Sequence, residues 1–226
     1  MEQEKLNDIL AAHERWLVSD GEEGACADLN GADLSGADLQ HAKLRHAKLR
    51  GTKFYRANLE WCDLEGADLH KASFHEAYLL EAKLMRANLG AADLSNAYLV
   101  RANLAWAHLK GANLEWVDLR GADLNGTDLC AANLGEANLG GAHLAHANLA
   151  GAFMHLAYLG GADLKDANLC WTYLHKAEHL TIAQLSGTLT LYMAQLDGVL
   201  LESLEQDHPH LLEEPDWLSD RVQEEF

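Results

Sequence analysis

The chain has 226 residues, 49% of them hydrophobic, and a formal net charge of −18 at pH 7. This apolar content is too high for a disordered chain, and an acidic chain is a poor ligand for nucleic acids or anionic membranes. No apolar run approaches the ~20 residues of a membrane span, and the N-terminal sequence does not have the pattern of a secretory signal. We therefore expect a folded cytoplasmic protein that neither binds nucleic acid directly nor enters a membrane.

The acidic residues are concentrated at the two ends of the chain. Residues 1–26 contain 7 acidic and 2 basic residues, residues 27–174 contain 17 and 13, and residues 175–226 contain 11 and 2. The corresponding net charges are −5, −4 and −9. A nearly neutral central region is thus predicted between two acidic segments.

The first predicted element is a helix over residues 3–18. Leu6, Ile9 and Leu10 recur at the three-and-four spacing of one helix face, and the Ser-Asp-Gly sequence at 19–21 is a typical end for such a helix. We expect residues 1–26 to form a capping helix and turn that cover the first unit of the next region.

The central region is a repeat of five residues. From Leu29 to Leu174 every fifth residue is large and apolar, at 30 consecutive positions, and 27 of these are Leu. Two residues before each stands a small side chain, Ala at 25 of the 30 positions. A period of five leaves no continuous stripe on a helix and no constant face on a long strand. It suits a chain that turns a corner in every unit, so that four units close one square coil.

Glycine is placed as such corners require. Of the 18 glycines, 14 lie in the two positions after the large apolar residue, where a tight turn can need a positive φ. Thirty units at four per coil predict a solenoid of about 7.5 stacked coils over residues 27–178. The apolar side chains would form its core.

These units resemble the motif of the pentapeptide-repeat family, commonly written A(D/N)LXX. ADLSG, ADLHK, ANLEW and ANLGG are typical examples in this chain. The resemblance implies an all-β solenoid, the right-handed quadrilateral parallel β-helix of that family. It says less about function, because members of the family serve several roles.

Outward charges support a coil of twenty residues. Residues twenty apart should stack, and Asp28, Lys48 and Asp68 alternate in sign at this spacing, as do Glu81 and Arg101. The same spacing explains the six bases between Lys43 and Arg56, several of which face an acid one coil away. An anion-binding or nucleic-acid patch is the alternative interpretation of that basic stretch.

The repeat phase breaks at His179, where a further large apolar residue is due. Thr181 and Gln184 have the spacing of a helix capping box, and a last helix is predicted to start near Asp197. We expect a helical cap over residues 179–206 and an acidic tail over residues 207–226.

No catalytic, cofactor-binding or metal-binding residues are predicted. Thirty units without an insertion leave no long loops for an active site, and no phosphate-binding loop or zinc-ligand spacing occurs. His155 and His175 are twenty residues apart and should stack, but no third ligand accompanies them. We expect stacked surface histidines, no cofactor, and free thiols at all four cysteines.

Apolar side chains at outward positions are the best candidates for partner binding. They are predicted to form one exposed patch on the third and fourth coils, with Met85 and Trp106 round the corner from the other members. Its members are Tyr78, Leu80, Met85, Tyr98, Val100 and Trp106. An aromatic ladder that serves only stacking is the alternative. A second group, comprising Phe153, Leu156, Trp171 and Tyr173, is expected to be covered by the C-terminal cap.

The sequence favours a non-enzymatic solenoid that acts as a protein-interaction or structural scaffold, with a protein partner of unknown identity. Self-association through the exposed apolar patch is also open. The family resemblance implies an alternative, a DNA mimic that binds a type II topoisomerase (DNA gyrase) and protects it from inhibitors. The nearly neutral repeat region argues against that alternative, because mimicry needs acid along the shaft.

Overall fold

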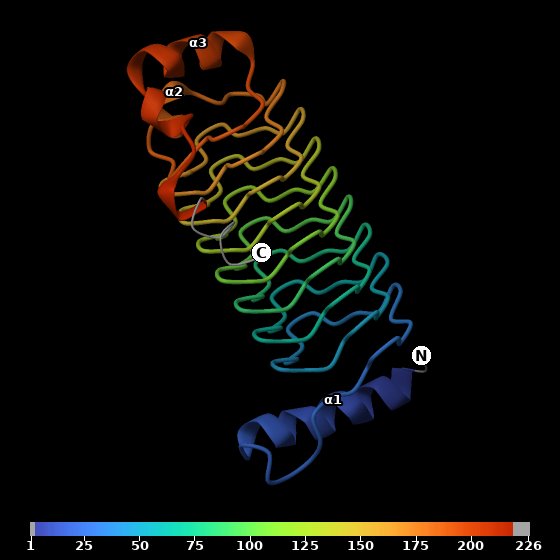
Figure 1. The fold of residues 1–226 in the computed structure, drawn as a ribbon. Coiled ribbons are helices and arrows are strands. Elements are labelled where there is room, and N and C mark those ends of the chain that lie inside the picture. Colours follow the sequence, from blue (N-terminus) through green and yellow to red (C-terminus); the bar gives the residue numbers. More distant parts are fainter. Residues whose placement is uncertain (1–2, 219–226) are drawn as a thin grey trace.

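A computed structural model describes residues 3–218 of the chain. It is an elongated rod of stacked coils, with helix α1 across one end and helices α2 and α3 at the other (Figure 1). The helices are α1 at Gln3–Val18, α2 at Ile182–Leu185, α3 at Gly198–Asp207 and the 3₁₀ helix η1 at Pro209–Leu211.

The rod is a parallel β-helix with twenty residues in each coil. Isolated parallel bridges join residues twenty apart, from Asp28 with Lys48 to Tyr158 with Glu178. Since the chain turns after every unit, each unit contributes one such bridge in the part of the chain described. Four units make one coil, and four columns of units make the four sides of the rod.

Backbone hydrogen bonds account for four of the five N–H groups in a unit. Around Leu79, for example, the Tyr78 N–H donates to the Ala57 carbonyl of the preceding coil, at 3.0 Å. Leu79 and Glu81 donate to carbonyls of the following coil, and Ala82 donates to Leu79. The N–H of the residue directly after the large apolar residue has no backbone acceptor.

The Asp or Asn of the motif supplies the missing acceptor. The Asn138 side chain accepts from the Gly140 N–H at 3.1 Å, and the Asp163 side chain accepts from the Lys165 N–H at 3.0 Å. The same bond recurs on all four sides of the rod. The sequence interpretation assigned these residues only to outward columns and missed this role as turn caps.

The core consists of the large apolar residues and the small residues that precede them. The two phenylalanines at core positions of the repeat, Phe54 and Phe74, stack with ring centroids 4.8 Å apart. Where Thr replaces Ala, its buried hydroxyl donates to a carbonyl of the preceding coil, as Thr127 does to Leu104 at 2.9 Å. These buried hydroxyls therefore have hydrogen-bond acceptors in the core.

Every corner of the rod has a residue with positive φ. Of the 23 non-glycine residues with positive φ among those described, all but Asp20, His179 and Met193 are the second residue after one of the large apolar residues of the repeat, Leu29 to Leu174. Glycines in the first position, such as Gly140 and Gly160, do not have positive φ. The expectation that glycine serves both positions in the same way is therefore wrong.

Helix α1 contacts the first coil through both apolar and polar groups. Leu6 is buried in the same core cluster as the repeat leucines. His13 is fully buried, and its Nδ1 accepts from the Ala27 N–H at 3.0 Å. Glu14 forms an ion pair with Lys43 of the coil.

Beyond the repeat, the chain makes one irregular coil. Thr181 and Gln184 form the predicted capping box at the start of α2. The bridges then resume with an offset of 22 residues, since Asn168 pairs with Thr190 and Tyr173 with Gln195. Residues 219–226 of the predicted acidic tail lie outside the described residues.

Within residues 3–218, none of the helices is both long enough and apolar enough to cross a membrane.

Candidate interaction face

Four of the six predicted patch residues lie on one side of the rod. Tyr78 and Tyr98 bridge each other in neighbouring coils, and their rings stack with centroids 5.2 Å apart and planes 6° apart. They remain 45% and 48% exposed. Leu80 and Val100 are half-buried beside them. We call these four residues the tyrosine face.

Met85 and Trp106 do not belong to the tyrosine face. Met85 lies on the next side of the rod, beyond the corner column that contains Glu81 and Arg101, and Trp106 lies at the corner where that next side ends. Trp106 is 56% exposed, and its indole covers Gly126 of the following coil, where an added Cβ would lie 2.5 Å from the ring. As the sequence predicts, these two residues lie round a corner from the tyrosines, and the structure shows that this corner is charged.

The tyrosine face lacks turn caps, as do the other units of the rod in which the motif has no Asp or Asn. Tyrosine replaces Asp or Asn before both Leu79 and Leu99, so no side-chain oxygen reaches the N–H of Leu80 or Val100. Among the described residues, no protein acceptor is recorded for either group. Two backbone donors in adjacent coils thus stand beside exposed aromatic rings, which suits contact with another macromolecule.

Charged pairs border the tyrosine face. At the corner after it, Arg101 and Glu81 form an ion pair of 3.9 Å. At the corner before it, Arg56 donates to Glu76 at 2.6 Å and holds the pKa of that carboxyl below its usual value. An apolar centre within a polar rim is the usual composition of a protein interface.

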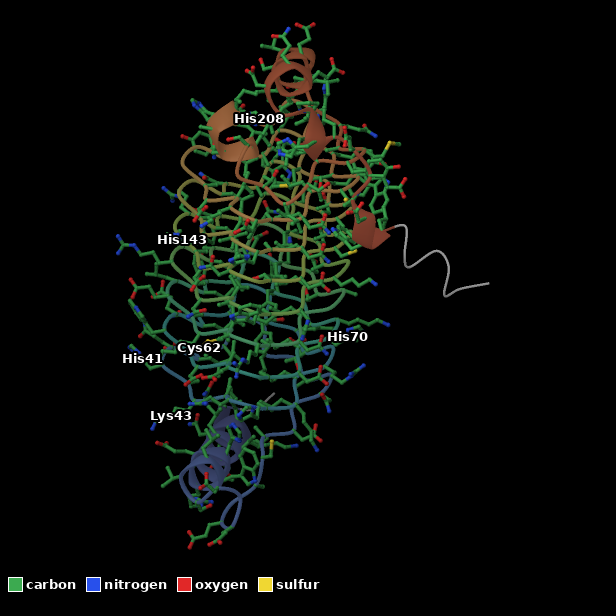
Figure 2. The ribbon with its side chains drawn as sticks, turned by 60° about the vertical axis from the view of Figure 1, so that its left-hand side comes forward. His41, Lys43, Cys62, His70, His143 and His208 are labelled. Atoms are coloured by element: carbon green, nitrogen blue, oxygen red, sulfur yellow. The ribbon has the colours of Figure 1, made fainter. Side chains whose placement is uncertain are left out.

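The side chains of the corner column change in size along the rod. Trp61 stacks on His41 with ring centroids 5.2 Å apart, whereas the column ends in Gly121, Gly141 and Gly161. Figure 2 shows His41 and His143 on one side of the rod and His70 on the opposite side. His41 marks the corner at which the side with the tyrosine face ends.

The second aromatic group is not covered by the C-terminal helices. Phe153 and Tyr173 stack at 4.5 Å and are 48% and 37% exposed, and Trp171 is 41% exposed. The expectation that the cap covers this group is therefore wrong. Met193, which the sequence analysis missed, is exposed at the equivalent corner of the next, irregular coil. The Ala194-Gln195-Leu196 unit after it could have revealed its position.

The basic stretch from Lys43 to Arg56 is largely ion-paired. Arg45 pairs with Glu65 at 3.2 Å, and Arg50 pairs with Asp68 at 3.2 Å. Lys43 bridges Asp63 of the following coil through its backbone, and its side chain forms an ion pair with Glu14 of α1. These bases link coils to one another and to the helix, as the structural interpretation predicts.

A cavity of about 540 Å³ lies near this stretch, between the end of α1 and the first coils. Trp16, Asp20 and Asp63 line it together with the bases Lys43 and Arg45. Both of these bases already have carboxylate partners, Glu14 and Glu65, so neither is a free positive charge that would select an anionic ligand.

His155 and His175 stack as predicted, with ring centroids 6.0 Å apart. The Nδ1 of His175 lies 2.6 Å from Oδ1 of Asp197, and the Nδ1 of His155 lies 2.9 Å from the His175 carbonyl. In residues 3–218, no three His, Cys, Asp or Glu side chains gather as a metal site. The four cysteines are free, and burial raises the pKa of the Cys62 thiol, which makes it a poor nucleophile.

Comparison with known proteins identifies the family to which the repeat belongs. A family model described as pentapeptide repeats matches residues 25–54, 52–90, 87–126 and 122–159, in 8 copies. A search of the curated proteins finds no match.

Several solved structures are similar to the chain. QnrB1, described as a plasmid-mediated fluoroquinolone resistance protein, is 20% identical, with 80% of this chain and 96% of that chain covered and a TM-score of 0.40. A pentapeptide repeat protein from the thylakoid lumen of Arabidopsis thaliana is 26% identical over 63% and 68% of the chains, with a TM-score of 0.20. Rfr23 from the cyanobacterium Cyanothece 51142 is 23% identical over 70% and 97%, with a TM-score of 0.22. On the strength of the repeat model, the chain belongs to the pentapeptide-repeat family and has its right-handed β-helix fold.

Proposed function

We propose that this protein is a non-enzymatic scaffold that forms a protein–protein interface through the tyrosine face. The repeat rod is the rigid part, and the outward residues of the third and fourth coils are the contact site. In this proposal Met85 and Trp106 form a separate, secondary contact on the neighbouring side.

The observation that carries the proposal is the exposure of the stacked tyrosines. Aromatic side chains that stay nearly half exposed in a folded protein retain apolar surface that a partner can remove from water. The uncapped N–H groups of Leu80 and Val100 add donors that a partner's oxygen atoms can satisfy. Both features coincide in the same two coils.

The test is affinity capture with tagged protein, followed by quantification of the captured proteins. The double variant Tyr78→Ala/Tyr98→Ala is compared with the wild type and with Phe153→Ala/Tyr173→Ala, which removes a stacked aromatic pair from the same repeat position on another side. We expect the first variant to lose at least 90% of a specific partner and the control to retain it. Equal capture by all three proteins would refute the tyrosine face as the contact site.

The remaining assignments are part of the same proposal. We place the protein in the cytoplasm, with no cofactor or metal. We divide the chain into an N-terminal cap over 1–26, a β-helix of about 7.5 coils over 27–178, a C-terminal helical cap over 179–206 and an acidic tail over 207–226.

A second candidate function is DNA mimicry toward a type II topoisomerase. It is favoured by the net charge of −18, most of which lies at the two ends of the chain. The test is supercoiling by DNA gyrase in the presence of a fluoroquinolone, with and without the protein. Restored supercoiling would favour DNA mimicry over the scaffold function. If the fluoroquinolone inhibits gyrase equally with and without the protein, DNA mimicry is refuted.

A further inference from the structure

We infer that the tyrosine face binds a second copy of this chain, with the two rods side by side and antiparallel. The two-fold axis would cross the face midway between the coil of Tyr78 and the coil of Tyr98. This inference rests on the proposed function, because it names the partner that occupies the same contact site.

The geometry follows from the columns of the β-helix. Coils are about 4.8 Å apart, so every column presents its residues at a fixed interval along the rod. A two-fold axis that lies in the interface and runs across the rod sets each column against the same column of the second copy, in reverse order. Each residue then faces the residue that is equally far from the axis on its other side.

This arrangement pairs opposite charges on both sides of the axis. Glu81 faces Arg101 of the second copy, and Arg101 faces Glu81 of the second copy. Because these two residues also pair within the chain at 3.9 Å, the four side chains form an alternating square of charge. Farther out, Glu60 faces Arg120 of the second copy.

The same arrangement matches apolar groups and sizes. Tyr78 faces Tyr98 of the second copy, and Leu80 faces its Val100. Trp61, the largest side chain of the corner column, faces Gly121, where even an added Cβ would meet only the Arg101 side chain, at 3.7 Å. A large side chain thus lies opposite a vacant position in the column.

Neighbouring arrangements bring like charges together. An axis through the coil of Tyr78 sets Glu81 against Glu81, and an axis through the coil of Tyr98 sets Arg101 against Arg101. An axis along the rod, which makes the rods parallel, exchanges the two corners and sets Glu81 against Glu76. Only the antiparallel arrangement centred between the two coils pairs these charges, and like-charge contacts strongly disfavour an interface.

The contact covers a single side of a few coils, so it is smaller than the ~800 Å² per partner of a standard interface. We therefore expect reversible association that is measured best by sedimentation equilibrium at protein concentrations up to several hundred micromolar. The average mass of the wild type should rise with concentration from 24.8 kDa toward twice that value.

Charge reversal provides the specific test. Glu81→Arg places two bases against each other at both corner contacts, and Arg101→Glu places two acids there. Each variant alone should associate at least tenfold more weakly than the wild type. An equimolar mixture of the two variants should associate again, because each chain then meets opposite charges on the other. A fault in the folding of one variant cannot produce that rescue.

Lys71→Glu is the matched control. Lys71 occupies the same corner position in the same coil as Glu81, also with positive φ, but at the diagonally opposite corner of the rod. Its association should equal that of the wild type. A wild type that stays monomeric at every concentration would overturn the inference, as would a mixture that does not associate.

The outcomes also separate this inference from the proposed function. If the wild type is monomeric and affinity capture still depends on Tyr78 and Tyr98, the face serves another protein and only the inference fails. If the wild type associates and Tyr78→Ala/Tyr98→Ala associates equally well, the two copies meet elsewhere and the inference fails. The proposed function fails with it only if affinity capture is also unchanged in that variant.

Discussion

The two halves of the rod share one backbone and one core but differ in what joins their coils. Residues 27–101 contain 10 acidic and 10 basic residues, whereas residues 102–174 contain 7 and 3. In the first half, ion pairs such as Arg45 with Glu65 connect neighbouring coils. In the second half, stacked amides do so, as where Asn133 donates to Asn113 at 3.1 Å.

This difference shows that the outward columns are interchangeable as long as the core is kept. Large apolar residues and turn caps are common to both halves, so we assign most of the stability to them. Charges and amides contribute less and act mainly on the alignment of the coils. Four measurements can break or sharpen this comparison.

Core substitutions should have the largest effect and should be alike in the two halves. Phe74→Ala removes a ring that stacks on Phe54, and Leu134→Ala removes the equivalent residue three coils later. The expected losses in the free energy of unfolding are about 3–5 and 2–5 kcal/mol. Urea denaturation followed by circular dichroism measures both. A loss below 1 kcal/mol in either half would contradict a shared core.

Substitutions in one outward column should differ between the halves. Asn148 donates to Asp128 at 3.0 Å, accepts from Asn168 and caps the Ala150 N–H. Asn148→Ala should cost about 1–3 kcal/mol, because several hydrogen bonds are lost together. Lys48→Ala, in the same column of the first half, should cost less than about 1 kcal/mol, because its ion pair is exposed. Equal costs would mean that amide and charge columns are equivalent.

Acid should weaken the attachment of α1. Burial lowers the pKa of His13 from 6.5, since charging the ring in the interior is unfavourable. When α1 detaches, His13 regains its ordinary pKa and binds more protons, so attachment loses stability as the pH falls below about 6.5. A carbonyl of Arg45 raises this pKa and His46 lowers it further.

Hydrogen exchange at pH 7.5 and pH 5.5, corrected for intrinsic rates, measures this effect. We expect protection to decrease at pH 5.5 in α1 and at Ala27, while amides of the C-terminal coils keep theirs. In His13→Gln, which retains a side-chain acceptor but does not titrate, the dependence on pH should disappear. If it persists, another group controls the attachment.

Salt should have the smallest effect. Raising the NaCl concentration from 0.05 to 0.5 M shortens the screening length well below 10 Å and weakens exposed ion pairs. Amide protection should therefore decrease by less than about 1 kcal/mol, and only in residues 27–101. A decrease of the same size in residues 102–174 would show that the charges are not its cause.

The sequence predicted the coil, its core and its stacked charges, because a period of five imposes a corner in every unit. It could not distinguish the two positions after the large apolar residue, since glycine occurs in both. Gly140 illustrates why. Its φ is not positive, and an added Cβ would lie only 3.1 Å from the Tyr158 ring, so a close approach of that ring and not the turn favours glycine there. The sequence did not reveal the turn cap formed by Asp or Asn, because stacking of the same residues in outward columns already explained why they recur.

The candidate site was predicted less completely than the fold. Tyr78 and Tyr98 followed directly from the twenty-residue spacing. Met85 and Trp106 were predicted to lie round a corner from them, but the ion pair of Glu81 and Arg101 at that corner was not predicted as a boundary of the surface. The exposure of Trp171 depends on the path of the chain after Glu178, and no repeat remains there to predict it.

The twenty-residue coil also limits how the gene for such a protein can change in length. Inserting or deleting one unit of five residues would turn every later column by a quarter of a revolution, so that acids and bases would meet new neighbours. Only a gain or loss of four units at once preserves the alignment and simply lengthens or shortens the rod. The offset of 22 residues between Asn168 and Thr190 occurs at the end of the stack, where no further regular coil follows that it could misalign.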